Sequence, residues 1–599
     1  MNKDNLKTKK LAHICRELIQ DGNKLSRRDL SMATGMSLGT INYILRKGEE
    51  INYFQSNGEH FNVTQTGLNF MEQFKVDNAI ILAAGFGLRC VPLTYETPKG
   101  LLTVYGKPML ERQIEQLLEK KISEIIIVVG YMKEKFDYLI DKYGVKLLYN
   151  PEYSTKNNLT SLYCALPYLK GSYILCADNW IEKNIFNAYE AESWFSCLYM
   201  EGNTNEWCVE QTKNERIKKI SIGGADAWAI VGPAYFSRIF SEKFAALLRE
   251  YYSMPGTEDY YWEHVLRENI SKLPMYMNKQ TDNVHEFEDL SELRRYDDSY
   301  INNSNNVIME SIASFFCVPE EKISDIFPIK EGLTNKSFHF CIGENGFVYR
   351  FPGIGTEKLI NRANEKYVYD AIKPMGISDN VLFFDANTGV KISEYIENAR
   401  NADPFNDVEL RVCMEQIRKV HTNSVKSAHS YDIASMIEYY YSLAEEINAI
   451  RFSDVGVVRD NMRQLLKLRQ IFNIPEVLCH GDFAHVNVLL LPDNTSRIID
   501  WEFSGMSDPI MDVSMFAIFA QFDRARIDLS LHMYLGRDAT KEEFARLYMY
   551  VALSGFLWCM WSEYKQRLGQ EFGEYPMIMY RYMKDYYDLL KRGNYITIG

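Results

Sequence analysis

Residues 79–99 restrict the fold of this 599-residue chain most strongly, because a short apolar run leads directly into a glycine-containing loop with two cations. The run Ala79–Leu82 is typical of a buried strand in a parallel sheet. The loop that follows carries Gly85 and Gly87, and Arg89 and Lys99 are its cations. Glycines let the backbone approach phosphates, and exposed N–H groups in such a loop bind anions. This order predicts a phosphate-binding loop at the end of a strand.

The rest of residues 77–300 alternates between strands and helices. Apolar runs at 125–131, 145–149 and 173–178 read as strands, with helices expected between them. This alternation predicts a doubly wound, Rossmann-like α/β sheet, which binds ligands beyond the carboxyl ends of its strands. Gly130, Tyr131 and Asp178 fall at those ends, together with the loop.

The whole order, from the strand through Ala-Ala-Gly-x-Gly-x-Arg to Pro98-Lys99, resembles the signature of nucleotidyltransferases. These enzymes join a nucleoside triphosphate to a phosphorylated small molecule. Arg89 and Lys99 suit the phosphates that leave as pyrophosphate, and we treat both as catalytic. Mg²⁺ on the phosphates needs hard oxygen ligands, for which we expect Asp178 and Glu288. The expected nucleotide-binding residues are Leu82, Ala83, Ala84, Gly85, Gly87, Arg89, Lys99, Gly130 and Tyr131.

Four further segments narrow this resemblance. Residues 156–158, 177–180, 204–207 and 259–262 look like those of bacterial CTP:phosphocholine cytidylyltransferases. The resemblance implies CTP and phosphocholine as substrates. It also implies an aromatic cage for the trimethylammonium, formed by Trp207, Tyr261 and Trp262, because aromatic faces attract a quaternary ammonium. The plainer alternative for the two tryptophans is ordinary packing. Many relatives have Asp where this chain has Glu288.

Residues 1–76 predict a small helical module ahead of this domain. A helix, a turn at Gly35 and a second helix starting at Ser37 resemble a helix-turn-helix. Asn57-Gly58 then predicts a hairpin, as in a winged helix-turn-helix. The module has 11 Lys and Arg against 8 Asp and Glu. DNA binding is one interpretation, and a packing or dimerisation module is the other, because the second helix is poor in cations.

A polar stretch at 302–306 predicts a linker, followed by a second enzyme domain over residues 305–599. We expect a small lobe at about 305–395 and a large lobe at about 396–599, with residues 331–337 as a turn between two strands. Arg350 on a strand and Glu365 on the next helix would form the cation–carboxylate pair that kinases use on ATP. Arg350 stands where protein kinases have Lys.

The strongest motif of this half is His480-Gly481-Asp482 followed by Asn487 and Asp500. A loop Asp, an Asn five residues later and an Asp at the end of a strand form the layout of phosphotransferases. Asp482 would accept the proton of the substrate hydroxyl, while Asn487 and Asp500 would hold Mg²⁺ on ATP. This layout predicts a bilobal, protein-kinase-like α+β domain.

Aminoglycoside, fructosamine and choline kinases share this layout, and residues 499–509 and 556–564 look most like choline kinases. The resemblance implies choline as the acceptor. Trp558 and Trp561 are three residues apart on one helix face, so that with Glu502 they could form a choline cage. A core stripe is the alternative.

The two halves predict one bifunctional, multidomain α/β enzyme that makes CDP-choline from choline, ATP and CTP with Mg²⁺. The alternatives are the same two steps on ethanolamine or another amino or sugar alcohol, or a transcriptional regulator that senses choline or nucleotides. The net charge of −13 argues against a general polyanion binder. Eleven cysteines without a Cys-x-x-Cys pair fit a cytoplasmic protein, and no membrane span is expected.

Overall fold

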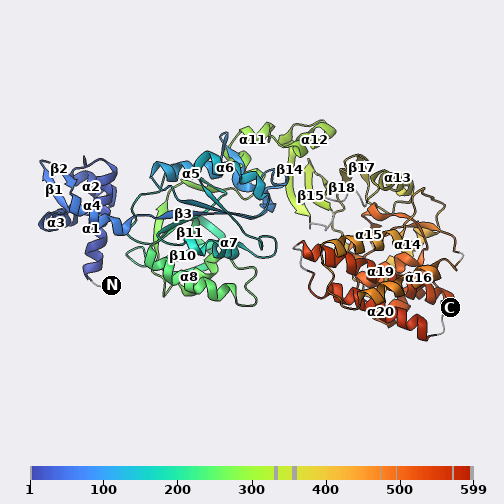
Figure 1. Cartoon of the computed structure of the whole chain (residues 1–599). Coiled ribbons are helices and arrows are strands. Elements are labelled where there is room, and N and C mark those ends of the chain that lie inside the picture. Colours follow the sequence, from blue (N-terminus) through green and yellow to red (C-terminus); the bar gives the residue numbers. More distant parts are fainter. Residues whose placement is uncertain are drawn as a thin grey trace. The chain divides into compact units, whose positions relative to one another are not determined.

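The computed structural model describes residues 3–329, 335–353, 360–472, 474–493, 495–568 and 572–593, with side chains from residue 8 onward. It consists of two compact units, Met1–Glu321 and Lys322–Gly599 (Figure 1). Residues 331–334 of the expected turn lie outside the described residues.

The boundary between the units lies later than predicted. In the polar stretch 302–306, Ser304 and Asn306 are buried. The Asn306 side chain caps helix α12 (Val307–Phe316) and donates a hydrogen bond to Glu96, 2.8 Å away. The last polar residue of the expected linker is therefore a helix cap, and α12 belongs to the first unit.

The first elements of the chain are three helices, a hairpin and a fourth helix: α1 (Lys3–Gln20), α2 (Arg27–Thr34), α3 (Leu38–Glu50), β1 (Phe54–Asn57), β2 (His60–Val63) and α4 (Gln65–Met71). Ser26 caps α2 in a capping box, and Ser37 caps α3. Gly35 ends α2 with φ 66°, a conformation that favours glycine. The turn between the two helices is thus fixed by local residues, as the sequence predicted.

Helix α1 attaches this N-terminal module (residues 3–74) to the following domain. Lys9 Nζ lies 2.6 Å from Glu192, and Arg16 Nη1 lies 3.1 Å from Glu190. Glu190 is buried, and burial raises the pKa of its carboxyl despite the charge of Arg16. The module is therefore held by a partly buried ion pair.

The second domain is built on a seven-stranded sheet in the order β12-β10-β11-β8-β3-β6-β7. Its strands are β3 (Asn78–Ala83), β6 (Ile125–Val129), β7 (Lys146–Tyr149), β8 (Ser172–Cys176), β10 (Trp194–Gln211), β11 (Ile217–Phe236) and β12 (Tyr276–Gln280). Strands β8, β3, β6 and β7 are parallel to their neighbours in this part of the sheet. Along β3, Ile80 and Leu82 face one hydrophobic cluster, whereas Ala79 and Ile81 face another.

Helices cover both faces of this sheet, including α5 (Met109–Glu119), α7 (Asn158–Cys164) and α8 (Arg238–Tyr252). Strands β3, β6 and β8 are buried on both sides, as their continuous apolar runs predicted, whereas β7 at the edge is partly exposed. The doubly wound α/β fold is confirmed.

The C-terminal unit starts with a five-stranded antiparallel sheet in the order β14-β15-β16-β18-β17. These strands are β14 (Ile323–Ile329), β15 (Asn335–Ile342), β16 (Asn345–Pro352), β17 (Val381–Phe384) and β18 (Lys391–Glu394), with helix α13 (Arg362–Ile372) between β16 and β17. A helical lobe follows, formed by α14 (Asp407–His421), α15 (Ile433–Glu446), α16 (Val455–Arg469), α17 (Ile510–Phe519), α18 (Arg524–Leu535), α19 (Lys541–Arg567) and α20 (Tyr575–Arg592). This is the predicted bilobal arrangement.

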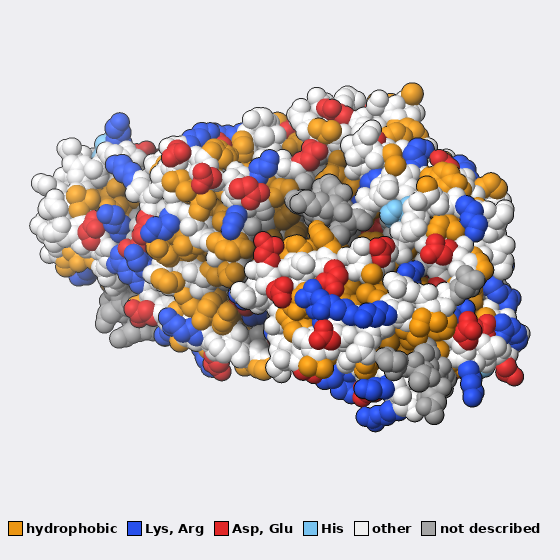
Figure 2. Space-filling model, turned by 45° about the vertical axis from the view of Figure 1, so that its right-hand side comes forward, with side chains coloured by type: hydrophobic (Ala, Val, Ile, Leu, Met, Phe, Trp, Pro, Cys, Tyr) orange, Lys and Arg blue, Asp and Glu red, His pale blue; other side chains and the backbone are white. Residues whose placement is uncertain are grey.

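None of the described helices is long and apolar enough to cross a membrane. On the face drawn in Figure 2, the described acidic and basic side chains are intermixed and form no continuous basic surface.

Replacing Arg16 with Met tests how the N-terminal module is attached. We expect docking to lose about 2 kcal/mol, below the ~3–5 kcal/mol of a fully buried pair, because 21% of the Arg16 side chain is exposed. Limited proteolysis of the full chain should then cut more rapidly within residues 1–76. Arg46→Met, which removes an exposed pair with Glu50, is the control. Equal cleavage of the Arg16 variant and the wild type would contradict this account.

Candidate active sites

The glycine-containing loop that we predict to bind phosphate lies at the carboxyl ends of β3 and β6, where the sequence placed it. Gly87 has φ 65°, and a Cβ atom there would lie 2.9 Å from Lys99 Cβ. Tyr131 N–H donates to Ala84 O (3.0 Å), and the Tyr131 hydroxyl donates to Thr94 O (3.0 Å). The structure therefore brings Gly130 and Tyr131 together with the loop.

An ion pair joins this loop to the neighbouring strand. Lys99 Nζ lies 2.6 Å from Asp178 Oδ2, just beyond the end of β8. Burial disfavours the charged form of Asp178, but Lys99 holds its pKa below the usual value. Burial also disfavours the Lys99 cation, but Asp178 raises the pKa of Lys99. Both groups are therefore charged.

The acid whose pKa responds most strongly to the charge of Asp178 is Glu286, and not the predicted Glu288. Glu286 ends β13 (Val284–Glu286) and pairs with Asn179 of β9 (Asn179–Ile181). The charge of Asp178, and then burial, raise the pKa of Glu286 to about 7. Glu288, the residue that the sequence suggested, pairs instead with Arg89 at 2.5 Å, and both side chains are largely exposed. The missed signal is the short strand β13, which pairs Glu286 with the first residue of β9, next to Asp178.

A second acid of this site was not predicted at all. Glu263 lies near the start of α9 (Trp262–Asn269) and is partly buried, and its desolvation raises the pKa of the carboxyl to about 8. Its Oε2 has no hydrogen-bond partner among the described residues. The charge of Glu286 adds to this increase in pKa. The carboxyl oxygens of Asp178, Glu286 and Glu263 are a donor set that suits Mg²⁺ or an ammonium ligand.

Of the three predicted cage residues, the structure leaves two accessible. The Trp207 ring meets His264 edge-on at 4.7 Å, and Tyr261 is 43% exposed and parallel to the same imidazole at 5.8 Å. Trp262 is only 1% exposed and stacks on Phe195 at 5.2 Å, within the core. The prediction for Trp262 is therefore wrong, because the apolar face of α9 turns its first residue inward.

The second site lies where a short strand of the C-terminal unit, β20 (Val477–Cys479), runs into the predicted loop. Asn487 Nδ2 donates to Asp482 O (3.0 Å) and to Asp482 Oδ2 (3.3 Å). Burial, and then the charges of Asp500 and Glu502, raise the pKa of Asp482 well above its usual value. Asp500 has φ 69°, and its buried Oδ1 accepts no hydrogen bond from the described residues. The donor set of Asn487 and Asp500 therefore fits Mg²⁺.

The predicted cation–carboxylate pair is also present. Arg350 on β16 forms a buried ion pair with Glu365 on α13. The same guanidinium lies 3.6 Å from Asp500 Oδ1. Arg350 therefore faces the group that would hold the metal.

The two tryptophans of α19 lie side by side, as their spacing predicted, but they belong to the hydrophobic core and Glu502 does not join them. Trp558 and Trp561 are largely buried, and their rings meet edge-on at 5.3 Å. Glu502 accepts hydrogen bonds from Arg362 (3.0 Å) and Asn335 (2.8 Å). The prediction that Glu502 joins the two indoles in a choline cage is therefore wrong, because its carboxylate is paired with Arg362.

Two tyrosines that the sequence did not suggest lie near the catalytic loop. Burial first, and also the charge of Asp482, raise the pKa values of Tyr440 on α15 and Tyr575 on α20. Both side chains come from helices distant in sequence from residues 480–500, so that no local pattern could reveal them.

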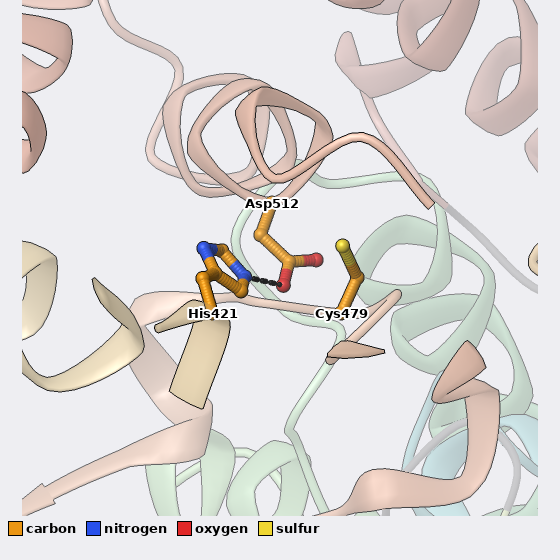
Figure 3. Close-up of side chains that lie close together, drawn as sticks. All are labelled: His421, Cys479 and Asp512. Atoms are coloured by element: carbon orange, nitrogen blue, oxygen red, sulfur yellow. Dashed lines mark hydrogen bonds and ion pairs between the residues drawn. The ribbon is translucent and has the colours of Figure 1, made fainter. Parts of the chain in front are cut away.

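Asp512 holds the backbone of the loop at residues 480–482 through hydrogen bonds. One of its oxygens accepts the His480 N–H (2.7 Å) and a hydrogen bond from His421 (3.0 Å), and the other accepts the Gly481 N–H (2.9 Å). Figure 3 shows His421 and Asp512 beside Cys479, an arrangement close enough to suggest a metal site. However, burial raises the pKa of the Cys479 thiol well above its usual value, and a thiol must lose its proton to bind metal. We therefore interpret the cluster as a support for the loop.

Replacing Asp512 with Asn tests this support. The amide can accept only one of the two backbone N–H groups, so we expect His480–Asp482 to shift and the phosphotransfer rate to fall about 10²-fold. The reaction of the first unit should not change in the same protein. Asp588→Asn, on the exposed side of α20, is the control. Full phosphotransfer activity in the Asp512 variant would show that the loop needs no such support.

The raised pKa of the partly buried Glu263 predicts that stability depends on pH. An unfolded Glu ionises near pH 4.5, but folded Glu263 keeps its proton up to about pH 8, so its contribution to stability falls as the pH rises between these values. Glu263→Gln should therefore raise the urea midpoint of the first unit more at pH 8 than at pH 5. Glu250→Gln, at an exposed position of α8, should show no such difference. An equal gain at both pH values for Glu263→Gln would rule out a buried, uncompensated carboxyl.

Comparisons with known proteins agree with this division. The nucleotidyl transferase family matches residues 78–193, and the phosphotransferase enzyme family matches residues 430–549. The choline-phosphate cytidylyltransferase of Streptococcus pneumoniae is 37% identical over 37% of this chain and 96% of its own length. The 2-aminoethylphosphonate cytidylyltransferase of Lancefieldella rimae is 34% identical over 37% of this chain and 93% of its own length.

Among solved structures, the choline kinase LicA of Streptococcus pneumoniae is 26% identical, with a TM-score of 0.42, over 47% of this chain and 98% of that one. The chain thus belongs to the family of choline-phosphate cytidylyltransferase, and a domain of the phosphotransferase enzyme family follows on its C-terminal side.

Proposed function

We propose that this chain makes CDP-choline in two steps, phosphorylating choline with ATP and then transferring a cytidylyl group from CTP to phosphocholine. The observation that carries the proposal is the resemblance of the first unit to a choline-phosphate cytidylyltransferase over almost the whole length of that relative. A kinase domain in the same chain would supply its substrate. Two sites with separate acidic loops, around Asp178 and Asp482, support two separate reactions.

In the first unit, Lys99 and Arg89 bind the triphosphate of CTP. The pair of Arg89 with Glu288 is largely exposed, and such pairs contribute little, so Arg89 can turn from Glu288 to the phosphates. Asp178, with Glu286 or Glu288, would hold Mg²⁺, which neutralises charge on the phosphates when bound. A phosphocholine oxygen then attacks the α-phosphorus, and pyrophosphate leaves.

The acceptor's trimethylammonium would lie against Trp207 and Tyr261. A quaternary ammonium donates no N–H hydrogen bonds, so it needs aromatic faces and nearby negative charge. Glu263 supplies that charge without an existing partner for its Oε2. Binding of the cation would favour the ionised form of this carboxyl.

In the C-terminal unit, Asp482 accepts the proton of the choline hydroxyl as its oxygen attacks the γ-phosphorus of ATP. Asn487 and Asp500 would hold Mg²⁺, and Arg350, oriented by Glu365, would bind the phosphates. Trp558, Trp561, Tyr440 and Tyr575 are the proposed walls of the choline site.

The order of helices and hairpin in residues 3–74 supports a winged helix-turn-helix. Its α3 has Arg46 and Lys47 balanced by Glu49 and Glu50, which is a weak electrostatic basis for DNA binding. DNA as a partner of this module therefore stays a prediction from the helix-turn-helix pattern. The acids at Asp178, Asp482 and Asp500 favour catalysis over a purely regulatory role.

Two isosteric variants test the proposed function. Asp482→Asn should lower choline phosphorylation by about 10²–10⁴-fold and leave pyrophosphate release from CTP and phosphocholine within twofold. Asp178→Asn should lower cytidylyl transfer by at least about 10²-fold and spare the kinase. Each variant is the folding control for the other. Loss of both reactions in either variant, or of neither, would refute two independent sites.

The same assay compares acceptors. Ethanolamine is the closest alternative for the kinase, and 2-aminoethylphosphonate would bypass it, because this compound already carries the phosphorus. Both have a primary ammonium, which needs hydrogen-bond acceptors rather than aromatic faces. A higher kcat/KM for ethanolamine than for choline, or for 2-aminoethylphosphonate than for phosphocholine, would show that the proposed substrate is wrong.

A further inference from the structure

The Arg350–Glu365 pair is one end of a longer series of buried charges in the C-terminal unit. Arg362, on the same helix as Glu365, donates from Nη1 to Glu365 Oε2 (2.8 Å) and to Glu502 Oε2 (3.0 Å). The side chains of Arg362, Glu365 and Glu502 are exposed by 9%, 0% and 1%. One guanidinium thus joins α13 to the loop that follows Asp500.

Two amides strengthen this connection. Asn335, the first residue of β15, donates to Glu502 Oε2 (2.8 Å), and its Oδ1 accepts from Arg362 (3.4 Å). Asn364 of α13 donates to Ser504 O (2.7 Å). Strand β15, helix α13 and the loop 500–504 therefore meet around Arg362.

The neighbouring backbone leaves room for this guanidinium. A Cβ atom at Gly389 would lie 2.8 Å from Arg362 Nε and 2.7 Å from Pro352 Cγ. The Gly389 carbonyl oxygen also accepts a hydrogen bond from Arg350 (3.2 Å). Any side chain at position 389 would therefore collide with Arg362.

The charges in this group depend on each other. Arg350 and Arg362 pair with Glu365 and Glu502, and removal of one member of a buried set leaves the other members without a partner. Glu502 is two residues beyond Asp500, so its position fixes the loop that carries Asp500. Asp500 in turn lies 3.6 Å from Arg350.

We propose that Arg362 is a positioning residue for Mg²⁺-dependent nucleotide binding. Through Glu365 it orients Arg350, and through Glu502 it places Asp500, so that the phosphate-binding cation and the metal ligand face the same phosphates. This role rests on the proposed phosphotransferase function, but not on the identity of the acceptor.

Arg362→Lys tests the role, since lysine keeps the charge but lacks the rigid fork that bridges two carboxylates. We expect the affinity of the full chain for ATP with Mg²⁺ to fall about 10–100-fold, and the affinity in EDTA to change less than threefold. Isothermal titration calorimetry measures both. If lysine at position 362 impairs folding, Asn335→Ser is the second variant. It removes one hydrogen-bond donor of Glu502, and we expect a smaller loss of Mg²⁺-dependent ATP affinity.

Lys366→Met is the matched control, because Lys366 lies on the same helix in an exposed pair with Asp370. Its ATP affinity should equal that of the wild type. Unchanged affinity in Arg362→Lys, or an equal loss with and without Mg²⁺, would overturn the positioning role and leave only a structural one. If the wild type itself shows no Mg²⁺-dependent ATP binding, the phosphotransferase function fails and this role fails with it, whichever acceptor is used.

Discussion

Carboxylates are concentrated at the two candidate sites, one in each unit of this chain, and the fold supplies cations for only some of them. In the first unit Lys99 compensates Asp178, but Glu286 and Glu263 have raised pKa values. In the second, Arg350 compensates Glu365, whereas burial and the charges of neighbouring acids raise the pKa values of Glu502 and Asp482. A metal ion or a cationic substrate would complete the balance, and such an excess of negative charge is typical of sites that bind Mg²⁺-nucleotides.

Much of both sites could be predicted because it is encoded in short segments. The strand at 79–82, its loop and Lys99 form one continuous stretch, and so do Asp482, Asn487 and Asp500. Spacing along the chain fixes such groups in the structure. The capped helices of the N-terminal module were predictable for the same reason, since Ser26 and Ser37 act on their own helices.

Other features depend on contacts between distant segments, which one sequence does not show. Glu286 reaches Asp178 only because β13 pairs with β9, so Glu288 was chosen in its place. Trp262 looked like a cage residue, but Phe195 covers it in the core. Glu502 is bonded to Arg362, 140 residues away, and this contact removes it from the predicted choline cage.

The proposed function requires that one chain carries choline through both reactions. The most direct measurement is to incubate the full chain with methyl-labelled choline, ATP, CTP and Mg²⁺ and to follow the label by chromatography. We expect labelled CDP-choline with all components, and labelled phosphocholine alone when CTP is left out. Label that stays in choline, under conditions that convert labelled ethanolamine, would rule out choline as the substrate.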